Sequence, residues 1–226
     1  VKPGVTEYEI EAEYLHEFVR NRSNGFAYQP IIASGASACV LHYIENHKEC
    51  LAGEMLLMDV GAEYGNYNAD MTRTIPVSGR FTERQRAVYD AVLRVQKEAS
   101  QILRIGTNIQ DYHKEVGLIM QSELVELGLI DQTDIRNQDP AWPAYKKYFM
   151  HGTSHHLGLD VHDVGTMHGP IKPGMVFTVE PGIYIQQEGL GIRLENNIVI
   201  QEGKGYFDLM RNIPVEAEEI EELMNS

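Results

Sequence analysis

The chain has 226 residues, of which 33 are acidic and 19 basic, and its net charge is -14. So negative a surface repels phosphate backbones and anionic lipid, which argues against nucleic acid and membrane as partners and leaves cations and small or basic substrates compatible. Two cysteines make no disulfide framework, and we expect neither a membrane span nor a signal peptide, which places the protein in the cytoplasm.

The chain opens on VKPGVTEYEI, which lacks a starting Met and enters a predicted helix within six residues. A chain of this length can bury one large core. We therefore expect residues 1–226 to be one domain, cut from a longer protein at a domain boundary.

Three helices are predicted by capping boxes, in which a Thr precedes Glu or Gln by three positions. The pairs are Thr6 with Glu9, Thr82 with Gln85, and Thr107 with Gln110. We expect a helix of roughly 15 to 20 residues after each. The second should close near Gly106 and carries an apolar stripe that predicts its core-facing side: Val88, Ala91, Val92, Val95, Ala99, Ile102 and Leu103.

Short apolar runs predict the strands. They are residues 29–34, 38–44, 54–62 and 68–79 between the first and second helices, and 147–152, 174–185 and 191–200 after the third. A helix and then strands, twice over, predicts two similar halves that face each other. The echo of VKPGVT (1–6) in IKPGMV (171–176) supports this weakly, because Pro-Gly is a common turn signal. The acidic segment 215–226 should end in a solvated amphipathic helix.

Two aspartates flank the turn of a predicted hairpin. Asp59 ends the apolar run 55–58, and Asp70 follows eleven residues later, with Gly65 at the expected turn. If the strands pair about a centre between Tyr64 and Gly65, Asp59 faces Asp70. Directly opposed like charges, with Cβ atoms about 5 Å apart, are destabilising unless something neutralises them. A divalent cation would do so; an exposed hairpin with solvated acids is the alternative.

Two glutamates occupy similar places. Glu180 ends the apolar part of MVFTVEPG (175–182), and Glu195 lies in GIRLENNIVI (191–200) with Arg193 on the same strand face. An ionised carboxylate there must be paired, protonated or bound to metal. For each glutamate taken singly a salt bridge is the alternative, to a lysine or to Arg193. Together, four acids and one imidazole suit two divalent cations, and carboxylate-rich ligation favours manganese or cobalt over structural zinc.

The segment MHGTSHHLGLDVHD (150–163) holds four of the nine histidines: His151, His155, His156 and His162. His151 and His155 have the spacing of a zinc-protease helix, but that template needs a Glu directly after the first histidine. Gly152 and Gly158 also disfavour a rigid helix here. A metal bound by this segment must therefore take its other ligands from elsewhere in the chain.

Five ordered segments carry a family resemblance: LHYIEN (41–46), LLMDVGAEYGNYNADMTRTIPVSGRFT (56–82), FMHGTSHHLGLDVHDVG (149–165), FTVEPGIYI (177–185) and GIRLENNIVI (191–200). They resemble the pita-bread metallopeptidases, and most closely the aminopeptidase P group, over essentially the whole chain. The resemblance implies an α+β pita-bread fold, in which two pseudo-symmetric halves of helices pack on a curved antiparallel sheet. It also implies that residues 1–226 are the catalytic domain and that the additional N-terminal domain of such proteins is absent.

The resemblance implies five metal ligands: Asp59, Asp70, His155, Glu180 and Glu195. Asp70 and Glu195 would bridge two divalent ions, which we expect to be Mn2+, with Co2+ or Zn2+ as alternatives. Glu180 is also the expected base, which takes a proton from the attacking water and passes it to the leaving amine. Arg193 is expected to hold Glu195 in place. Glu7, on the first helix, should be neutral, so that Glu7→Ala leaves metal binding unchanged.

The same resemblance assigns the substrate-binding residues. His42 and His162 are expected to reach the substrate carbonyl and the developing oxyanion, and both count as catalytic. His151 should line the pocket for the residue after the scissile bond, and Arg193 should also contribute to substrate binding. No role follows for His156. The remaining histidines should be surface or supporting residues: His16, His47, His113 and His168.

The implied activity is that of a dinuclear-metal aminopeptidase, which releases the first residue from peptides with proline in second position. The full-length protein is expected to be a homo-oligomer. Among enzymes, the alternatives are an Xaa-Pro dipeptidase, with the same ligand set, and a methionine aminopeptidase, which HGTSHHLGLDVHD (151–163) resembles less. Outside the enzymes, the alternative is a peptide-binding module that has lost its metals, against which the five filled ligand positions argue.

Overall fold

The computed structural model describes residues 1–166, 169–203 and 205–226, so His168 lies outside the described residues. Helices combined with antiparallel sheets confirm the predicted α+β class. The helices are α1 (Glu7–Arg20), α2 (Glu83–Ile102), α3 (Ile109–Glu126), α4 (Gln132–Asn137) and α5 (Ala217–Met224), with short 3₁₀ helices η1 (Gly35–Cys39), η2 (Ala144–Lys147) and η3 (Gln186–Glu188). None of these described helices is long and apolar enough to cross a membrane.

The described strands form four antiparallel sheets, two in each half of the chain. The first half contains β1 (Gly25–Phe26), β4 (Ala62–Tyr64) and β5 (Tyr67–Asn68) in the order β1-β4-β5, and β2 (Ile31–Ser34), β3 (Met55–Asp59) and β6 (Thr72–Pro76) in the order β2-β3-β6. The second half contains β7 (Val176–Val179), β10 (Asn196–Gln201) and β11 (Gly205–Asp208) in the order β11-β10-β7, and the pair β8 (Gly182–Ile185) and β9 (Leu190–Arg193).

The helices begin close to the predicted caps. Thr6 and Thr82 precede α1 and α2, each in a capping box. The third helix begins one residue later than predicted, because Asn108 rather than Thr107 caps it: the Asn108 side chain accepts the Gln110 N–H at 2.9 Å. An Asx turn of this kind competes with the Thr-based box.

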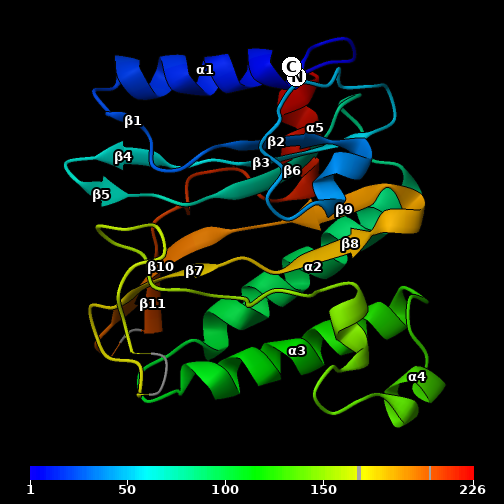
Figure 1. Cartoon of the computed structure of the whole chain (residues 1–226), viewed down its shortest axis with the longest axis vertical. Coiled ribbons are helices and arrows are strands. Elements are labelled where there is room, and N and C mark those ends of the chain that lie inside the picture. Colours follow the sequence, from blue (N-terminus) through cyan, green and yellow to red (C-terminus); the bar gives the residue numbers. More distant parts are fainter. Residues whose placement is uncertain (167–168, 204) are drawn as a thin grey trace.

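Helices cover the strands from two sides. In Figure 1, α1 lies beside β2 and β3, while α2 lies on the opposite side, against β7 to β9, and α3 packs on α2. Most of the predicted α2 stripe is buried in the largest core, and Ile102 packs at its edge. Smaller cores lie under α1, around Ile10 and Leu56, and under η1, around Tyr43 and Tyr184.

Two predicted strands are wrong. The chain leaves β2 at Gly35, whose φ of +53° lies in the left-handed region, and residues 40–48 continue as a loop after η1. Segment 147–152 likewise follows η2 without forming a strand. In both segments apolar side chains such as Tyr43 and Phe149 are buried without strand pairing. A short apolar run in the sequence does not distinguish a buried loop of this kind from a strand.

The predicted repeat is present, but the corresponding segments differ from those expected. Before α1, the Gly4 N–H donates to the Cys50 carbonyl at 3.0 Å; before α3, the Gly106 N–H donates to the Ile171 carbonyl at 2.9 Å. A second backbone bond runs the other way in each case. The Cys50 N–H donates to the Val5 carbonyl at 2.8 Å, and the Ile171 N–H donates to the Thr107 carbonyl at 2.9 Å. The segment before α1 therefore corresponds to the segment before α3, and not to 171–176.

This correspondence places two of the predicted ligands at equivalent points. Asp59 lies nine residues after Cys50, at the end of β3, and Glu180 lies nine residues after Ile171, directly after β7. The two halves thus bring a carboxylate each to the same end of their central strands.

The halves join through β6 and β9. The Thr74 hydroxyl donates to the Arg193 carbonyl at 3.0 Å and accepts the Arg193 N–H at 3.2 Å. Close by along both chain segments, the Asn197 side chain accepts the Asp70 N–H at 3.1 Å and donates to the Asp70 carbonyl at 2.5 Å. These reciprocal contacts fix the two halves relative to each other next to the acids.

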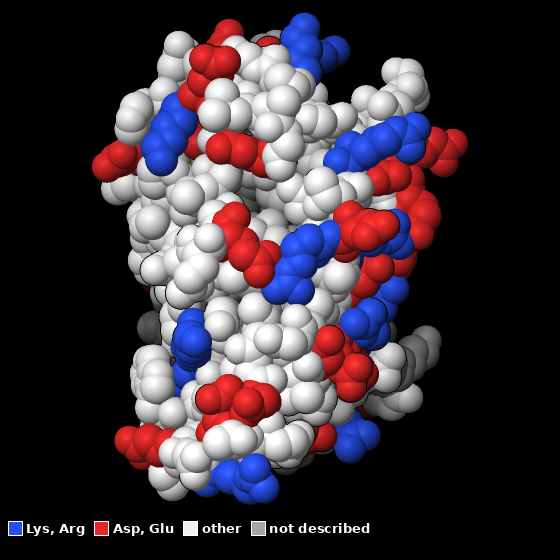
Figure 2. Space-filling view, turned by 90° about the vertical axis from the view of Figure 1, so that its right-hand side faces the viewer, with Lys and Arg blue, Asp and Glu red and all other residues white. Residues whose placement is uncertain are grey.

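The net negative charge does not form a single patch on the face shown in Figure 2, where acidic and basic side chains are interspersed. Pairs such as Arg84 with Glu188 (2.7 Å) and Arg94 with Glu123 (2.6 Å) join residues of different elements. Exposed pairs of this kind contribute about 1 kcal/mol or less each.

Candidate active site

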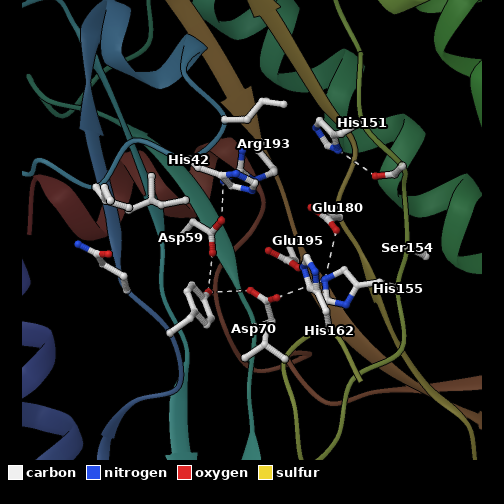
Figure 3. A pocket seen from close by; sticks show the side chains of 17 residues that line it. His42, Asp59, Asp70, His151, Ser154, His155, His162, Glu180, Arg193 and Glu195 are labelled. Atoms are coloured by element: carbon white, nitrogen blue, oxygen red, sulfur yellow. Dashed lines mark hydrogen bonds and ion pairs between the residues drawn. The ribbon is translucent and has the colours of Figure 1, made fainter. Parts of the chain in front are cut away.

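A cavity of about 640 Å3 opens where the two halves meet, a volume suited to a small ligand. Every residue predicted for the metal or substrate site lies on its wall, and Figure 3 shows carboxylates and imidazoles that converge on it. The lining residues are Tyr28, Gln29, Ile31, Leu41, His42, Ile44, Asp59, Asp70, His151, Gly152, Ser154, His155, Val161, His162, Glu180, Arg193 and Glu195.

Asp59 and Asp70 come together, but not as the directly opposed pair that we predicted. Asp59 pairs with Thr72, so Asp70 lies two positions along the chain from Asp59's direct partner. The side chains still meet, because residues two apart share a face. The hydroxyl of Tyr28 lies between them, 2.5 Å from Asp59 Oδ1 and 2.6 Å from Asp70 Oδ1.

Arg193 supports Asp59 directly, which corrects the expectation that it holds Glu195. Its guanidinium donates to Asp59 Oδ2 at 2.5 Å and to the Tyr184 hydroxyl at 2.9 Å. It reaches Glu195 only through Thr72, whose hydroxyl accepts from Arg193 Nε at 3.1 Å and donates to Glu195 Oε2 at 2.7 Å. Arg193 is 4% exposed and lines the cavity, and its contact with substrate stays a prediction.

The carboxylates of Glu180 and Glu195 lie in surroundings that disfavour their negative charge, and a bound cation would offset that cost. Burial, and then the charge of Asp70, raises the pKa of Glu195 well above its usual range. Its Oε1 is buried and has no hydrogen-bond partner among the residues that the structure describes. Burial likewise raises the pKa of Glu180 to about 8, although His155 and Arg193 act in the opposite direction. Buried carboxylates without partners are costly unless they bind a cation.

His155 presents a lone pair to the acids. Its Nδ1 lies 2.9 Å from the His156 carbonyl, which can only accept, so Nδ1 carries a proton. In neutral imidazole the other nitrogen, Nε2, is then an acceptor. Nε2 lies 3.4 Å from Asp70 Oδ2 and 3.5 Å from Glu180 Oε1. Burial lowers the His155 pKa, but the hydrogen bond to Asp70 and the charge of Glu180 outweigh it and raise the pKa overall, so the acids favour a positive charge at Nε2, either a proton or a bound cation.

The donor set therefore fits a metal centre. Asp70, His155 and Glu195 each offer a ligand atom, and these atoms all lie within 4.8 Å of one another. Asp59 and Glu180 lie on the same wall. A lone pair and several carboxylates that face one space repel unless a cation lies between them, and a histidine whose far nitrogen is held by a carbonyl is typical of metal ligands. That these five residues bind metal stays a prediction.

The other histidines of the cavity differ in which of their ring atoms are free to contact a ligand. His151 Nδ1 lies 2.8 Å from the Gly152 carbonyl and its Nε2 lies 2.7 Å from the Tyr184 hydroxyl, and burial lowers its pKa to about 3. Both of its nitrogens are thus engaged with protein, so it offers ring carbons to a ligand. The His162 ring lies 4.2 Å from that of His155, and burial, with the charge of His155, lowers its pKa. His42 also lines the cavity.

Sequence reasoning missed several supporting residues. Tyr28 joins the two aspartates, and Thr72 joins Arg193 to Glu195. His113, expected to be a surface or supporting residue, is half-buried with Nε2 3.1 Å from the Ser154 carbonyl. Neither Tyr28 nor His113 carries a spacing that marks it. Thr72 does lie two residues after Asp70, on the same strand face, so the period of two could have found it.

A carboxylate-rich, histidine-containing candidate metal site between two similar α+β halves is typical of metal-dependent hydrolases. The chain belongs to metallopeptidase family M24, whose model matches residues 1–202. The fold is the pita-bread fold of that family, as the resemblance implied: the structure of aminopeptidase P from E. coli with the inhibitor Pro-Leu is similar with a TM-score of 0.91. That match has 43% identity and covers 99% of this chain and 53% of the other.

Other relatives agree. The Xaa-Pro aminopeptidase of Escherichia coli K12 is 44% identical over 99% of this chain and 53% of its own length, and Xaa-Pro aminopeptidase 3 of Rattus norvegicus is 36% identical over 98% of this chain and 45% of its own. The structure of proline aminopeptidase P II from Yersinia pestis has a TM-score of 0.91 at 42% identity, over 99% of this chain and 54% of that one. The chain thus spans about half the length of the curated relatives it matches.

Proposed function

We propose that the full-length protein is a dinuclear-metal aminopeptidase that releases the first residue from peptides with proline in second position. The observation that carries this is the metal centre: five candidate ligands on one cavity wall, with Glu195 Oε1 buried and unpartnered within the described chain. The similarity to Xaa-Pro aminopeptidases of 42% to 44% identity supports the substrate class.

The metal would be held by residues of both halves. Asp59 and Asp70 come from the first half, and His155, Glu180 and Glu195 from the second. Two divalent cations, when bound, would supply a nucleophilic water of lowered pKa and polarise the peptide carbonyl. The oxygen-rich ligand set favours Mn2+, with Co2+ and Zn2+ as alternatives. A relative, E. coli aminopeptidase P, has been solved in a Zn-substituted form with product.

Glu180 is the proton carrier of this proposal. It is a carboxylate on the cavity wall beside the other candidate ligands, where it can accept a proton and return it. Its extended backbone before Pro181 keeps the side chain at the strand end. Glu180 would take a proton from the attacking water and pass it to the leaving nitrogen of proline.

His42 and His162 would donate to the substrate carbonyl and the developing oxyanion. They lie on the cavity wall with the ligands between them in Figure 3. A donor aimed at developing charge typically lowers the barrier by about 3 kcal/mol. His151, whose nitrogens are engaged by Gly152 and Tyr184, would shape the pocket for the residue after the scissile bond.

Proline specificity follows from the chemistry of the scissile bond. A bond to proline has no N–H to donate and a fixed ring conformation, so an enzyme that cleaves it needs a pocket for the ring and a proton source for the imino nitrogen. The His151 segment would supply the former and Glu180 the latter. We further propose a cytoplasmic homo-oligomer as the working form of the full-length protein.

A substrate panel on the Mn2+-loaded, full-length protein tests this function. We expect release of the first residue from Xaa-Pro-Yaa tripeptides and longer peptides, weaker activity on Xaa-Pro dipeptides, and little cleavage of Met-Ala-Yaa. A preference for bare dipeptides would make the protein an Xaa-Pro dipeptidase, and a preference for Met-Ala-Yaa would exclude the proline pocket. A folded protein that binds neither Mn2+ nor Co2+ would be a peptide-binding module instead.

A further inference from the structure

The loop of residues 40–48, which we call the His42 loop, forms part of the cavity wall without belonging to a strand or helix. Leu41, His42 and Ile44 line the cavity. Val40 and Ile44 are exposed to solvent. A loop with so little regular pairing needs other contacts to hold a side chain in one place.

Those contacts come from Glu7, the first residue of α1. Glu7 is 0% exposed, although it is an acid on a surface helix. Its Oε1 accepts the Ser34 N–H at 2.8 Å and the Ser34 hydroxyl at 2.7 Å. Its Oε2 accepts the Tyr43 hydroxyl at 2.8 Å and the Lys48 N–H at 3.0 Å. One carboxylate thus joins α1 to the end of β2 and to both arms of the His42 loop.

A second acid on the same face of α1 holds the middle of the loop. Asn46, at φ +45°, accepts the Ile32 N–H at 2.9 Å and donates to the Pro30 carbonyl at 2.9 Å, so its side chain pairs with β2 as a strand would. The same amide donates to Glu11 Oε2 at 2.8 Å. Glu7 and Glu11 are four residues apart and therefore neighbours on the helix.

The four donors to Glu7 are neutral N–H and O–H groups, so the carboxylate is satisfied by geometry rather than by an opposite charge. A buried charge is costly, and apolar packing would attach α1 to the sheet at lower cost. Hydrogen bonds are directional, whereas apolar packing is not, so the four bonds to the two Glu7 oxygens fix the positions of Tyr43 and Lys48. Burial, and then Glu7, raises the pKa of Tyr43 to about 12, so its phenol stays a donor.

We propose that Glu7 is a positioning residue that sets the place of His42 in the cavity through Tyr43 and Lys48. Tyr43 is the direct neighbour of His42 in the chain, and its side chain is buried toward α1 while His42 lines the cavity. This proposal deepens the proposed function and rests on it for the effect on catalysis. Under this proposal Glu7→Ala is not neutral, because that change would leave three buried donors and the Lys48 N–H without their acceptor.

The structural part of the proposal is tested by amide hydrogen exchange of the full-length, Mn2+-loaded protein. In Glu7→Gln the new amide nitrogen replaces one carboxylate oxygen. In one orientation it faces the donors of Tyr43 and Lys48, and in the flipped orientation it faces those of Ser34, so two donors oppose each other in either case. In Tyr43→Phe one hydrogen bond is lost. We expect exchange in residues 41–48 to accelerate by about tenfold or more in both, since each change removes a hydrogen bond to a charged group that holds the loop closed. Glu13→Gln, the same change on the exposed side of α1, is the matched control and should leave exchange unchanged.

The catalytic part is tested by a double-mutant cycle with His42→Ala. With two metals per chain retained, Glu7→Gln and Tyr43→Phe should each lower kcat about tenfold, and neither should lower it further in the His42→Ala background. Equal losses in both backgrounds, or unchanged exchange in residues 41–48, would overturn the proposal. If Glu7→Gln does not fold, Tyr43→Phe decides alone. If the wild type cleaves no Xaa-Pro-Yaa peptide, the proposed function fails, and the exchange experiment still decides whether Glu7 fixes the loop.

Discussion

The hydroxyl of Thr72 donates to Glu195 Oε2 at 2.7 Å, across the junction of the two halves. Because Arg193 Nε donates to the same hydroxyl at 3.1 Å, the proton of Thr72 is directed at the glutamate. The threonine therefore orients one oxygen of Glu195 and leaves the other, the unpartnered Oε1, for a ligand.

Thr72→Val should weaken metal binding about 10- to 100-fold, the usual effect of losing a group that orients a ligand. Titration of the metal-free protein with Mn2+ measures this. Thr74→Val is the control, because Thr74 is equally buried in β6 but bonds only to the Arg193 backbone in the described structure. A variant at Thr72 with wild-type affinity would show that the metal alone orients Glu195.

Asp70→Ala should abolish binding of both ions at ordinary metal concentrations, because a bridging carboxylate serves two sites at once. Metal content per chain, measured after dialysis, is the readout. Glu13→Ala, on the exposed side of α1, replaces Glu7→Ala as the neutral control. Two equivalents of metal in the Asp70 variant would refute the bridging role.

Glu180→Gln should lower kcat about 10²- to 10⁴-fold with a much smaller change in KM, because the amide cannot carry a proton. Steady-state kinetics at saturating Mn2+ on an Xaa-Pro-Yaa peptide provides the test. Metal content must be measured alongside, since Glu180 is also a predicted ligand. An unchanged kcat would assign the proton transfer to another group.

His162→Ala should slow turnover by about 3 kcal/mol in barrier height, roughly 100-fold, if its imidazole meets the developing oxyanion. His156→Ala is a useful comparison, because His156 packs on Phe177, with ring centroids 4.4 Å apart, and does not line the cavity. Its replacement should affect stability more than turnover. Equal effects of the two changes on kcat would argue against a specific role for His162.

Metal should stabilise the protein more at pH 8 than at pH 6. The pKa of Glu180 is raised to about 8 and those of Glu195 and Asp59 are raised by burial, so the metal-free folded state holds protons that the unfolded state releases above its ordinary carboxyl pKa. The stability from these protons is full below about pH 4.5 and is lost as the pH rises toward 8. Metal replaces the protons, so the increase in Tm on adding Mn2+ should grow across this window. A constant increase would contradict the assignment.

Much of the site could be predicted because strand ends are visible in the sequence: Asp59 and Glu180 each end an apolar run, and both reach the cavity. The hairpin register could not be predicted from the hydrophobic pattern, because that pattern does not show at which residues the chain turns. The turn in fact centres on Gly65 and Asn66, both at positive φ (60° and 68°), so that Tyr64 pairs with Tyr67. A two-residue hairpin turn of this kind requires positive φ at both central residues, which Gly and Asn tolerate, and that rule would have given the register.

Buried polar contacts escaped prediction for a different reason. Glu7 has the sequence surroundings of a solvated helix acid, and only the distant residues Ser34, Tyr43 and Lys48 show that it is interior. Likewise Tyr28 reaches Asp59 and Asp70 from a segment between β1 and β2, where no periodic pattern applies. Such contacts depend on chain segments that meet only after folding.

The division of the ligands between the halves has a consequence for how the molecule can be taken apart. Two of the predicted ligands precede α3 and three follow it, and the reciprocal bonds of Asp70 with Asn197 lie at the junction of the two halves. A metal bound across that junction ties together two pieces of chain that the segment between α2 and α3 otherwise connects, so it acts as a noncovalent staple. A nick introduced near Ile105 would leave two fragments that the shared core still holds together, and the bound ions should make their association tighter.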